Sequence, residues 1–569
     1  MSRENADLSD TPQSGQEQAE SPSAKPTGQS WKIDGKKTII YCFYALLAHL
    51  ILHTVILHFT IAHLNGAQEY REGAILDTTM LLIGGDHPYN PENAPTHTNV
   101  YGVTLSAIMA WLSPWVHPDL TNHRIVSGIF LFFACVVLWS VAMKSGLGKR
   151  DAFFVGAFFY IIYNLSYSVL ARPDSVGVFS MLTCIRLAMV SPGRPWSVAS
   201  WCASIIFAGL AFFTKPYFLF GAGCAAVYIG WHRSLKQSVV YWAGICGFLA
   251  LLLVVASKAW PMYWFSTFQI HRLANTPHTE HFWSQWQFFS ITHVFWLGAL
   301  AAGVPGLLHW KRLNKDSIKL AWTSGIGSIV PGHWAGFCMI TASVILAMSL
   351  AWHQGAYFIY FVHLLTPFVL LTGGMALKNR HLEIRETGHR IPLNSVVALA
   401  QIIVLLSVIR PVPTMEMGPY LASKTLLDRN LKLLVTPLLV PEMIEQGIEY
   451  PDNGQTEYFL ACSLGFPEDT DKDILNISSE FIDDLRSKMS EAYWDRIIMV
   501  PTLFSHYFRD EDIQANYEYK GGFKHYSYYA RFLKPWIYGG EGASYPVQIW
   551  ERKSSLTTTN ASPQMSLAQ

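Results

Sequence analysis

Residues 38–64 have the sequence TIIYCFYALLAHLILHTVILHFTIAHL, which contains no Asp, Glu, Lys or Arg. A helix needs about 20 mostly apolar residues to cross a bilayer, so this run predicts a membrane-spanning helix. Lys32, Lys36 and Lys37 stand directly before it. Residues 1–36 are rich in Ser, Gln, Glu, Asp and Pro and have no early apolar stretch, which predicts a disordered cytoplasmic tail and not a cleaved signal peptide.

Further apolar runs of similar character follow along the chain. They lie at 125–143, 152–170, 175–190, 197–213, 216–231, 238–257, 289–308, 329–351, 356–376 and 392–409. Together with the first run they predict an all-α polytopic membrane domain over residues 37–411, with about eleven transmembrane helices. Only 14% of the residues are charged, against about 25% in soluble proteins. The net charge of +1 gives no argument for a nucleic-acid partner.

Loop charge gives these spans a direction. Lys or Arg occurs in each of the loops 144–151, 191–196, 232–237, 309–319 and 377–391. Cytoplasmic loops of membrane proteins carry such an excess of basic residues. The pattern therefore predicts a multi-pass protein of the cell inner (cytoplasmic) membrane, with its N-terminus inside and its C-terminal part outside.

The chain changes character after residue 411, where polar and acidic residues become more frequent. Residues 412–552 predict a small α/β extracytoplasmic domain, and residues 553–569 predict a disordered tail. The expected strands are 432–440, 456–462, 496–500 and 546–551. A helical pattern over 479–493 places Ile482, Leu485 and Met489 on one face, with Ser478 and Ser479 as candidate caps.

The large outer loop, residues 65–123, carries three carboxylates soon after the first span: Glu69, Glu72 and Asp77. Its apolar stretches 75–83 and 100–116 suit helices that lie along the membrane surface. Two interpretations of the carboxylates stay open. They start helices, where the helix dipole favours a negative charge, or one of them, partly desolvated at the bilayer edge, acts as a general base.

Four short motifs accompany this loop: REGAILDTTMLLIGGDHPY at 71–89, ARPDS at 171–175, FFTKP at 212–216 and HQGAY at 353–357. In this order and topology, the chain resembles the bacterial-type GT-C superfamily of membrane glycosyltransferases, which use polyprenyl-phosphate-linked sugars. The resemblance implies an enzyme, a hexosyl- or pentosyltransferase that acts with inversion. Carried over to this sequence, it makes Glu72 the general base and holds Asp77 in reserve.

A lipid-phosphate donor needs positive charge at its phosphate more than it needs a second acid, because phosphate already leaves well. Arg172 and Lys215 are the predicted phosphate ligands, since they stand in very short outer turns against the positive-inside bias. An alternative stays open, in which Asp174 neutralises Arg172 in a structural pair. The predicted substrate-binding residues are Arg71, Tyr89, Asn99, Tyr101, Arg172, Asp174, Lys215, His271, Arg272, His353 and Tyr357.

The expected partners are a polyprenyl-phosphate-linked sugar donor, a glycan or lipid acceptor, and membrane lipids. No cofactor is expected. A divalent metal ion is not indicated, because His278 and His281 have no accompanying carboxylate cluster. A non-catalytic transporter or flippase for a lipid-linked substrate remains an alternative, as does a polysaccharide ligase or polymerase. The C-terminal domain is expected to help select the acceptor.

Overall fold

The computed structural model describes most of the chain. The described residues are 35–166, 170–189, 198–273, 279–296, 298–299, 320, 322–324, 326, 333–351, 359–384, 389–409, 426–501, 507–525 and 545–554. Residues 1–46 and 47–569 form separate units. The described part of the first unit begins helix α1. The predicted tails fall almost entirely outside the described residues.

Apolar helices make up most of the chain before residue 410. They are α1 (Gly35–Ala62), α4 (Leu120–Lys144), α5 (Lys149–Ser166), α6 (Asp174–Ala188), α7 (Val198–Thr214), α8 (Phe220–His232), α9 (Leu235–Ala259), α14 (His333–Ala351), α15 (Ile359–Leu364), α16 (Thr366–Leu377) and α17 (Leu393–Val408). Within the described residues, three helical stretches are long and apolar enough to cross a membrane: Tyr41–Ala62, Leu120–Lys144 and Leu235–Ala259. The chain is therefore described as a membrane protein, and the count of eleven spans stays a prediction.

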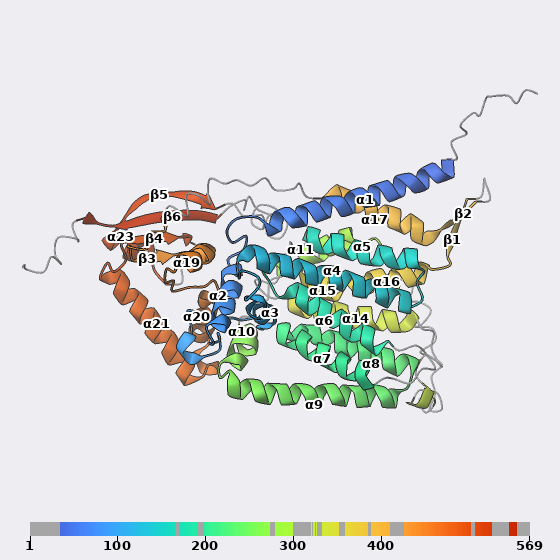
Figure 1. The fold of residues 1–569 in the computed structure, drawn as a ribbon, viewed down its shortest axis with the longest axis horizontal. Helices are drawn as coiled ribbons and strands as arrows, with labels where there is room; N and C mark the ends of the chain where they lie inside the picture. Colours follow the sequence, from blue (N-terminus) through green and yellow to red (C-terminus); the bar gives the residue numbers. More distant parts are fainter. Residues whose placement is uncertain are drawn as a thin grey trace, which may run out of the picture. The chain divides into compact units, whose positions relative to one another are not determined.

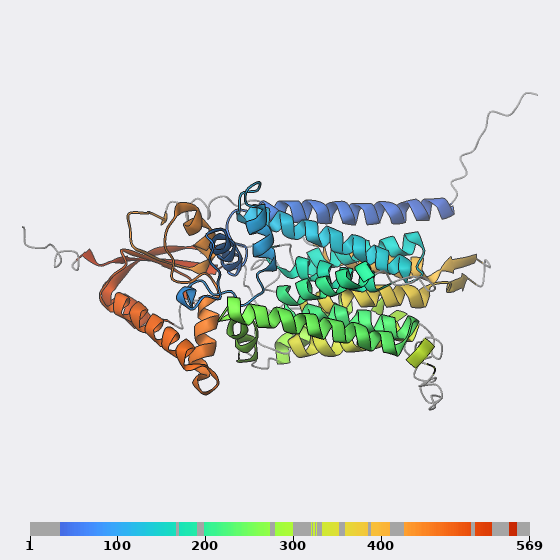
Figure 2. The same ribbon diagram turned by 60° about the horizontal axis from the view of Figure 1, so that its bottom comes forward.

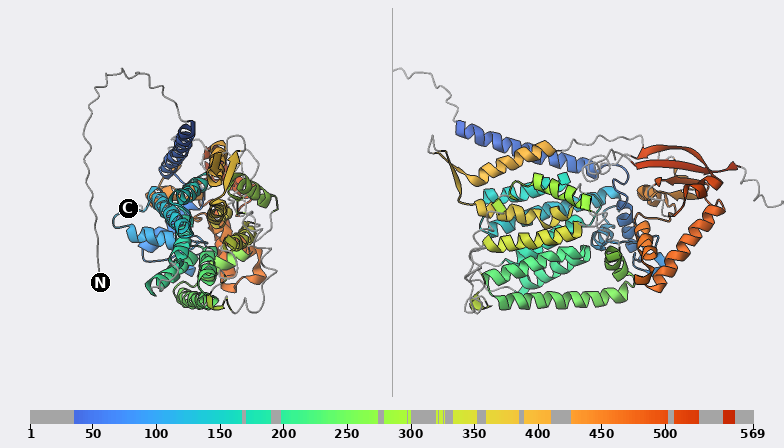
Figure 3. Two further views of the ribbon diagram at one scale, coloured as in Figure 1. Left: turned by 90° about the vertical axis from the view of Figure 1, so that its right-hand side faces the viewer. Right: turned by 180° about the vertical axis from the view of Figure 1, so that it is seen from behind.

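Within the second unit, helices α4 to α9 and α14 to α17 run side by side (Figures 1 and 3). Gly177 and Gly221 allow close packing, because a Cβ on either would approach the neighbouring Phe218 ring or the Met181 backbone at less than 3 Å. The short helices of the outer loop lie at one end of these helices, and Figure 2 shows them there from another side.

The outer loop contains two α-helices and one 3₁₀ helix: α2 (Glu72–Ile83), η1 (Pro91–Asn93) and α3 (Thr104–Leu112). Between α9 and α11 (Thr279–Thr292) follow a π-helical stretch, η3 (Phe265–Gln269), and α10 (Ile270–Leu273). A short 3₁₀ helix, η2 (Pro216–Leu219), joins α7 to α8, and a hairpin of β1 (His381–Ile384) and β2 (His389–Pro392) joins α16 to α17. Of the polar residues considered below, Glu72 and Asp77 lie in α2, and His271 and Arg272 lie in α10.

A four-stranded sheet forms the centre of the C-terminal segment, residues 426–554. Its strands are β3 (Leu433–Val435), β4 (Arg496–Met499), β5 (Tyr517–His525) and β6 (Tyr545–Arg552), and their order is β3-β4-β6-β5. β3 pairs with β4 in parallel and the other pairs are antiparallel. The helices of this segment are η5 (Pro437–Leu439), α19 (Val440–Gln446), α20 (Thr456–Gly465), η6 (Pro467–Asp469), α21 (Lys472–Ser490) and α23 (Asp510–Asn516).

Three details of this segment differ from the sequence prediction. The expected strand 456–462 is helix α20, whose buried residues Thr456, Phe459, Leu460 and Ser463 recur at helical spacing. The expected strand 432–440 ends at Val435, because Pro437 starts η5. The predicted helix over 479–493 starts earlier, at Lys472, where Asp471 caps it by accepting a hydrogen bond from Asp473 N at 2.9 Å. Ser478 is buried inside the helix and is not its cap.

One apolar core joins the outer loop to the C-terminal segment. It contains Ile75 of α2, Leu105 of α3, Ile270 of α10, Phe459 of α20 and Ile497 of β4. The C-terminal segment is therefore packed on the outer loop through shared buried side chains, and it does not merely follow the membrane helices along the chain.

We expect Gly102→Ala to lower the thermal unfolding midpoint in detergent. A Cβ at Gly102 would lie 1.5 Å from the Phe213 carbonyl oxygen, and Gly102 N donates a hydrogen bond to Thr214 O at 3.2 Å, so the backbone would have to move. Strain of this kind costs on the order of 1–3 kcal/mol. The control is Gly223→Ala in α8, where nothing lies within 4 Å of the added Cβ. Equal midpoints in the two variants would contradict the expectation.

Candidate functional site

A buried ion pair between Glu72 and Arg124 connects the outer loop to the membrane helices. Arg124 Nε donates to Glu72 Oε1 at 2.8 Å, and Arg124 Nη2 donates to Glu72 Oε2 at 2.7 Å. Both side chains are fully buried. Arg124 also donates to the carbonyl oxygens of Leu64, at 2.6 Å, and Gly66, at 2.8 Å. The pair therefore fixes the exit of α1 against the start of α4.

Glu72 has no carboxylate position to spare for an acceptor hydroxyl. Besides Arg124, it accepts hydrogen bonds from Gln68 N, at 2.7 Å, and Ala171 N, at 2.8 Å. Burial alone would raise the pKa of Glu72, but Arg124 and these backbone N–H groups hold it below its ordinary value. A strongly paired carboxylate of low pKa is a poor base. Glu72 thus has the environment of a structural group, unlike the general base that the sequence predicts.

Asp77 is also fully engaged, with partners from two parts of the chain. Its Oδ1 accepts from Tyr450 OH at 2.6 Å and pairs with His97 Nδ1 at 2.9 Å, and its Oδ2 accepts from Asn453 Nδ2 at 2.8 Å. Burial alone would lower the pKa of His97, but Asp77 raises it. Asp77 therefore joins α2 to the C-terminal segment, which leaves it unsuited to the reserve role as base.

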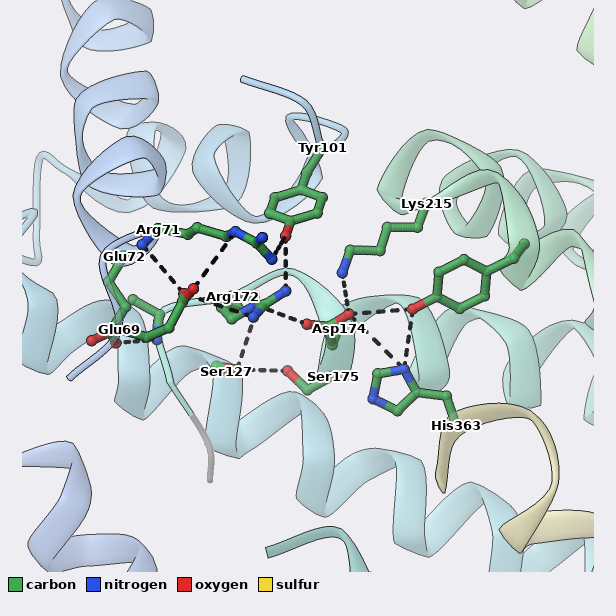
Figure 4. A network of polar contacts seen from close by, with 12 residues as sticks. Glu69, Arg71, Glu72, Tyr101, Ser127, Arg172, Asp174, Ser175, Lys215 and His363 are labelled. Atoms are coloured by element: carbon green, nitrogen blue, oxygen red, sulfur yellow. Dashed lines mark hydrogen bonds and ion pairs between the residues drawn. The ribbon is translucent and has the colours of Figure 1, made fainter. Parts of the chain in front are cut away.

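Five side chains lie around the phenol of Tyr101, and together the six residues come from four separate stretches. We call them the Tyr101 cluster: Glu69, Arg71, Tyr101, Arg172, Asp174 and Lys215 (Figure 4). Tyr101 OH accepts hydrogen bonds from Arg71 Nη1 at 3.1 Å and from Arg172 Nη2 at 2.9 Å. Lys215 Nζ lies 4.2 Å from the centroid of the Tyr101 ring. The cluster thus holds three cations close together around a single oxygen and ring.

Asp174 balances two of these cations. Its Oδ1 accepts from Lys215 Nζ at 2.5 Å, and its Oδ2 lies 3.3 Å from Arg172 Nε. Tyr217 OH donates to the same Oδ1 at 3.3 Å and lies 3.1 Å from His363 Nδ1. The sequence alternative that Asp174 pairs with Arg172 is therefore present in the structure, but the pairing is shared with Lys215 inside one cluster.

Glu69 supplies the second carboxylate, and it differs from Glu72 in its surroundings. It is fully buried, and its ion pairs are long: 3.6 Å from Oε1 to Arg71 Nε and 3.7 Å from Oε2 to Arg172 Nη1. Oε2 accepts from Arg71 N at 3.3 Å, whereas Oε1 accepts no hydrogen bond from any described residue. Burial raises the pKa of Glu69 above its ordinary value, against the pull of Arg172 and Arg71. A buried carboxylate with one oxygen that accepts no hydrogen bond has the character of a general base.

The cluster has an excess of positive charge. Arg71, Arg172 and Lys215 against Glu69 and Asp174 leave a formal net charge of +1 among these residues. Burial alone would raise the pKa of Tyr101, but Arg172, Arg71 and Lys215 hold it below its ordinary value. Both features show that the cluster stabilises negative charge, as a phosphate site must.

The remaining predicted site residues have other roles or lie apart. Tyr89 OH donates to Tyr101 O at 2.5 Å, and Asn99 Oδ1 accepts from Tyr101 N at 2.9 Å, so both hold the main chain of Tyr101. His271 Nε2 contacts Val100 O at 2.9 Å, and burial lowers the pKa of His271 to about 4, which makes it neutral and not a cation.

Arg272 lies outside the cluster, mostly exposed, with Asp469 at 3.8 Å. The predicted residues His353 and Tyr357 lie outside the described residues, and so does His278.

Sequence reasoning counted Glu69 among three candidate carboxylates but chose Glu72, with Asp77 in reserve, and it missed Arg124 and His363. His363 is a polar group within the otherwise apolar helix α15, and such groups are functional or tightly paired as a rule. Arg124 lies in the first turns of α4, directly after Thr121, Asn122 and His123. Among the described residues, no three His, Cys, Asp or Glu side chains lie close enough to hold a metal ion. The sequence-based expectation that no divalent metal ion is indicated stays a prediction.

Several solved structures are similar to this chain over most of its length. ArnT from Cupriavidus metallidurans bound to undecaprenyl phosphate shares 12% identity, covering 91% of this chain and 99% of that one, with a TM-score of 0.46. Its apo form shares 12% identity, covering 92% of this chain and 99% of that one, with a TM-score of 0.45. The oligosaccharyltransferase of Archaeoglobus fulgidus in the apo form shares 10% identity, covering 88% of this chain and 74% of that one, with a TM-score of 0.45.

No protein-family model matches the sequence, and no curated protein matches it. Identities and TM-scores at this level do not define a family or an activity, so the function is argued from the site.

We expect Glu72→Gln to destabilise the protein at pH 7. It leaves Arg124 buried without its counter-charge, and breaking a buried ion pair from one side costs about 3–5 kcal/mol. Because the pKa of Glu72 is lowered on folding, its contribution is present above the ordinary glutamate pKa of 4.5 and is lost as the pH falls. Thermal unfolding in detergent measures the loss.

The exposed Glu92 of η1 provides the matched control for this variant, as Glu92→Gln. A Glu72→Gln protein that is as stable as Glu92→Gln would show that the ion pair does not fix the loop.

Proposed function

We propose that this protein is a glycosyltransferase that moves a sugar from a polyprenyl-phosphate donor to an acceptor hydroxyl, on the outer side of the cytoplasmic membrane and with inversion. The observation that carries the proposal is the position of Glu69. Its Oε1, which accepts no hydrogen bond from a described residue, is buried beside the cationic groups of the Tyr101 cluster. A base and an anion-binding site within one buried cluster are the two parts that this reaction needs.

The proton and electron balance is complete with these residues. Glu69 takes the proton of the acceptor hydroxyl, and the acceptor oxygen forms a bond to the anomeric carbon of the donor sugar. The bond between that carbon and the phosphate oxygen breaks, and the polyprenyl phosphate leaves with the electron pair. Attack opposite the leaving group inverts the anomeric centre. Only one carboxylate acts as a base, because phosphate leaves without being protonated, unlike the leaving group in most glycoside hydrolases.

The three cations serve the phosphate. Arg71 and Arg172 present planar guanidinium groups that can each form two hydrogen bonds to phosphate oxygens, whereas Lys215 acts as a point charge. Their excess of charge over Glu69 and Asp174 matches the negative charge that develops on the leaving phosphate. Undecaprenyl phosphate, the ligand in one of the similar structures, belongs to the proposed ligand class.

The proposal keeps the sequence-based topology, with the cluster and the C-terminal segment outside, and it needs no cofactor. It moves the base from Glu72 to Glu69, because the oxygens of Glu72 are fully paired. A transporter or flippase would not need a base, so the rate of glycosidic-bond formation separates the two functions.

We expect Glu69→Gln to reduce the turnover of sugar transfer by about 10²–10⁴-fold, the usual worth of a general base. Binding of polyprenyl phosphate should remain, because the cations are untouched. The wild-type rate should fall with decreasing pH around a value above 4.5, since burial raises the pKa of Glu69, and the base works only when it is ionised. The assay follows transfer in reconstituted membranes at matched protein amounts.

Glu92→Gln, an exposed position in the same loop, is the control for Glu69→Gln and should transfer at the wild-type rate. Near-normal turnover in Glu69→Gln would exclude Glu69 as the base and favour a transporter or flippase. The same conclusion would follow if the rate of Glu69→Gln fell at acidic pH as the wild-type rate does.

We expect Arg172→Gln and Lys215→Met to raise the KM for the donor by about 10- to 150-fold, since a hydrogen bond to a charged group contributes about 1.5–3 kcal/mol. Lys258→Met is the control, because Lys258 is an exposed lysine at the end of α9 and should leave the donor KM unchanged. Unfolding midpoints are measured in parallel, since Asp174 loses a partner in both test variants. A donor KM that changes equally in all three variants would contradict the assignment.

A further inference from the structure

Every main-chain N–H and C=O group from Val100 N to Gly102 N, around Tyr101, has a hydrogen-bond partner. Val100 N donates to Gln455 Oε1, and Val100 O contacts His271 Nε2 at 2.9 Å. Tyr101 N donates to Asn99 at 2.9 Å, and Tyr101 O accepts from Tyr89 at 2.5 Å. Gly102 N donates to Thr214 O, at the end of α7, at 3.2 Å. The position of the Tyr101 phenol is therefore set by its backbone as well as by the arginines that it contacts.

The turn Asp452–Thr456, which we call the DNGQT turn, supplies much of this hold from far along the chain. Asn453 Nδ2 donates to Thr98 O at 2.9 Å and to Asp77 Oδ2 at 2.8 Å. The Thr456 hydroxyl lies 3.0 Å from Pro95 O and 3.1 Å from Thr96 O, so its one proton is shared between them. With Gln455 on Val100, the turn contacts residues 95–100 along their length.

The DNGQT turn is hydrogen-bonded within itself and closely packed against the outer loop. Asp452 Oδ1 accepts from Gly454 N at 2.7 Å, and Asn453 Oδ1 accepts from Gln455 N at 3.0 Å. Gly454 has φ +100°, and a Cβ there would lie 2.2 Å from Tyr70 O. The turn thus also touches the residue directly before Arg71. It therefore reaches two of the three stretches that meet at the phenol oxygen, those of Tyr101 and Arg71.

We propose that the DNGQT turn is a positioning element of the site, which holds residues 95–100 and Tyr70 so that the Tyr101 phenol bridges Arg71 and Arg172. Asn453, Gln455 and Thr456 are positioning residues, since they act through Tyr101. The C-terminal segment then completes the donor-phosphate site, in addition to any part in selecting the acceptor. The consequence for catalysis rests on the proposed function, whereas the hold on residues 95–100 does not.

Gln455→Met is the sharpest test variant. Gln455 is 1% exposed, and its Nε2 has no hydrogen-bond partner among the described residues. The near-isosteric change therefore removes the bond from Val100 N and no other described hydrogen bond of this side chain. Amide hydrogen exchange of a peptide covering residues 96–102 should speed up about 3- to 10-fold, the range that a single net hydrogen bond allows. Gln514→Met, at an exposed position of α23, is the matched control.

A double-mutant cycle with Tyr101→Phe tests the route of action. Gln455→Met alone and Tyr101→Phe alone should each lower kcat/KM for the donor, by about 10- to 100-fold for a misplaced site. The kcat/KM of the double variant should be no lower than that of the less active single variant, because both changes act on the same bridge. The same cycle is run on the Kd of polyprenyl phosphate in micelles, which needs no chemistry.

The outcomes are separable. Unchanged exchange in Gln455→Met would overturn the hold, and losses that multiply in the double variant would overturn the route through Tyr101. A wild-type protein that binds polyprenyl phosphate but transfers no sugar would overturn the proposed function alone, with the Kd cycle still deciding the route. If it neither transfers nor binds, both the function and the catalytic part of this inference fail, and the exchange result still decides the hold.

Discussion

The site depends on one buried ion pair, Glu72 with Arg124, because that pair decides where the chain goes after α1. Two charges without access to water are stable only when every oxygen and N–H has a partner. Here those partners are the carbonyls of Leu64 and Gly66 and the N–H groups of Gln68 and Ala171. The stretch between them has little freedom left, and it is this stretch that presents Glu69 and Arg71 to the ARPDS turn. The structural carboxylate and the proposed catalytic one are three residues apart, and Glu72 N donates a hydrogen bond to Glu69 O at 3.0 Å.

The sequence predicted a great deal of this arrangement from general physics. Apolar runs located most of the apolar helices, including α1, α4 and α9, which are long enough to cross a membrane, since a helix in lipid must be apolar over its length. Arg172 and Lys215, noted for being basic in short outer turns, do lie together on Asp174. What sequence could not decide was which carboxylate is paired, because the partner of Glu72 is 52 positions away. The outcome depends on that partner, and a single sequence contains no signal for it.

The C-terminal segment shows the same limit in another form. Period-2 and period-3.6 patterns are hard to tell apart over seven residues, so the apolar stretch at 456–462 was predicted as a strand although it is helix α20. The strand β5 contains Gly521 and Gly522, residues that are unfavourable in strands, and it was not predicted. The fold of the C-terminal segment depends on what it packs against. Asn453 donates a hydrogen bond to Thr98 O and Gln455 accepts one from Val100 N, and both bonds span more than 350 positions.

Under the proposed function, Asp174 has a consequence for the end of each reaction cycle. A cluster of three cations with no counter-charge would hold a phosphate so firmly that the spent lipid carrier would leave slowly. Because Asp174 already occupies Lys215 and part of Arg172, an arriving phosphate competes with a resident anion and gains only the difference between the two. When the carrier departs, Asp174 pairs again with Lys215 and Arg172. Under the proposed function, the resting cluster therefore exchanges one anion for another, which keeps affinity moderate and lets the enzyme release its product and accept the next donor.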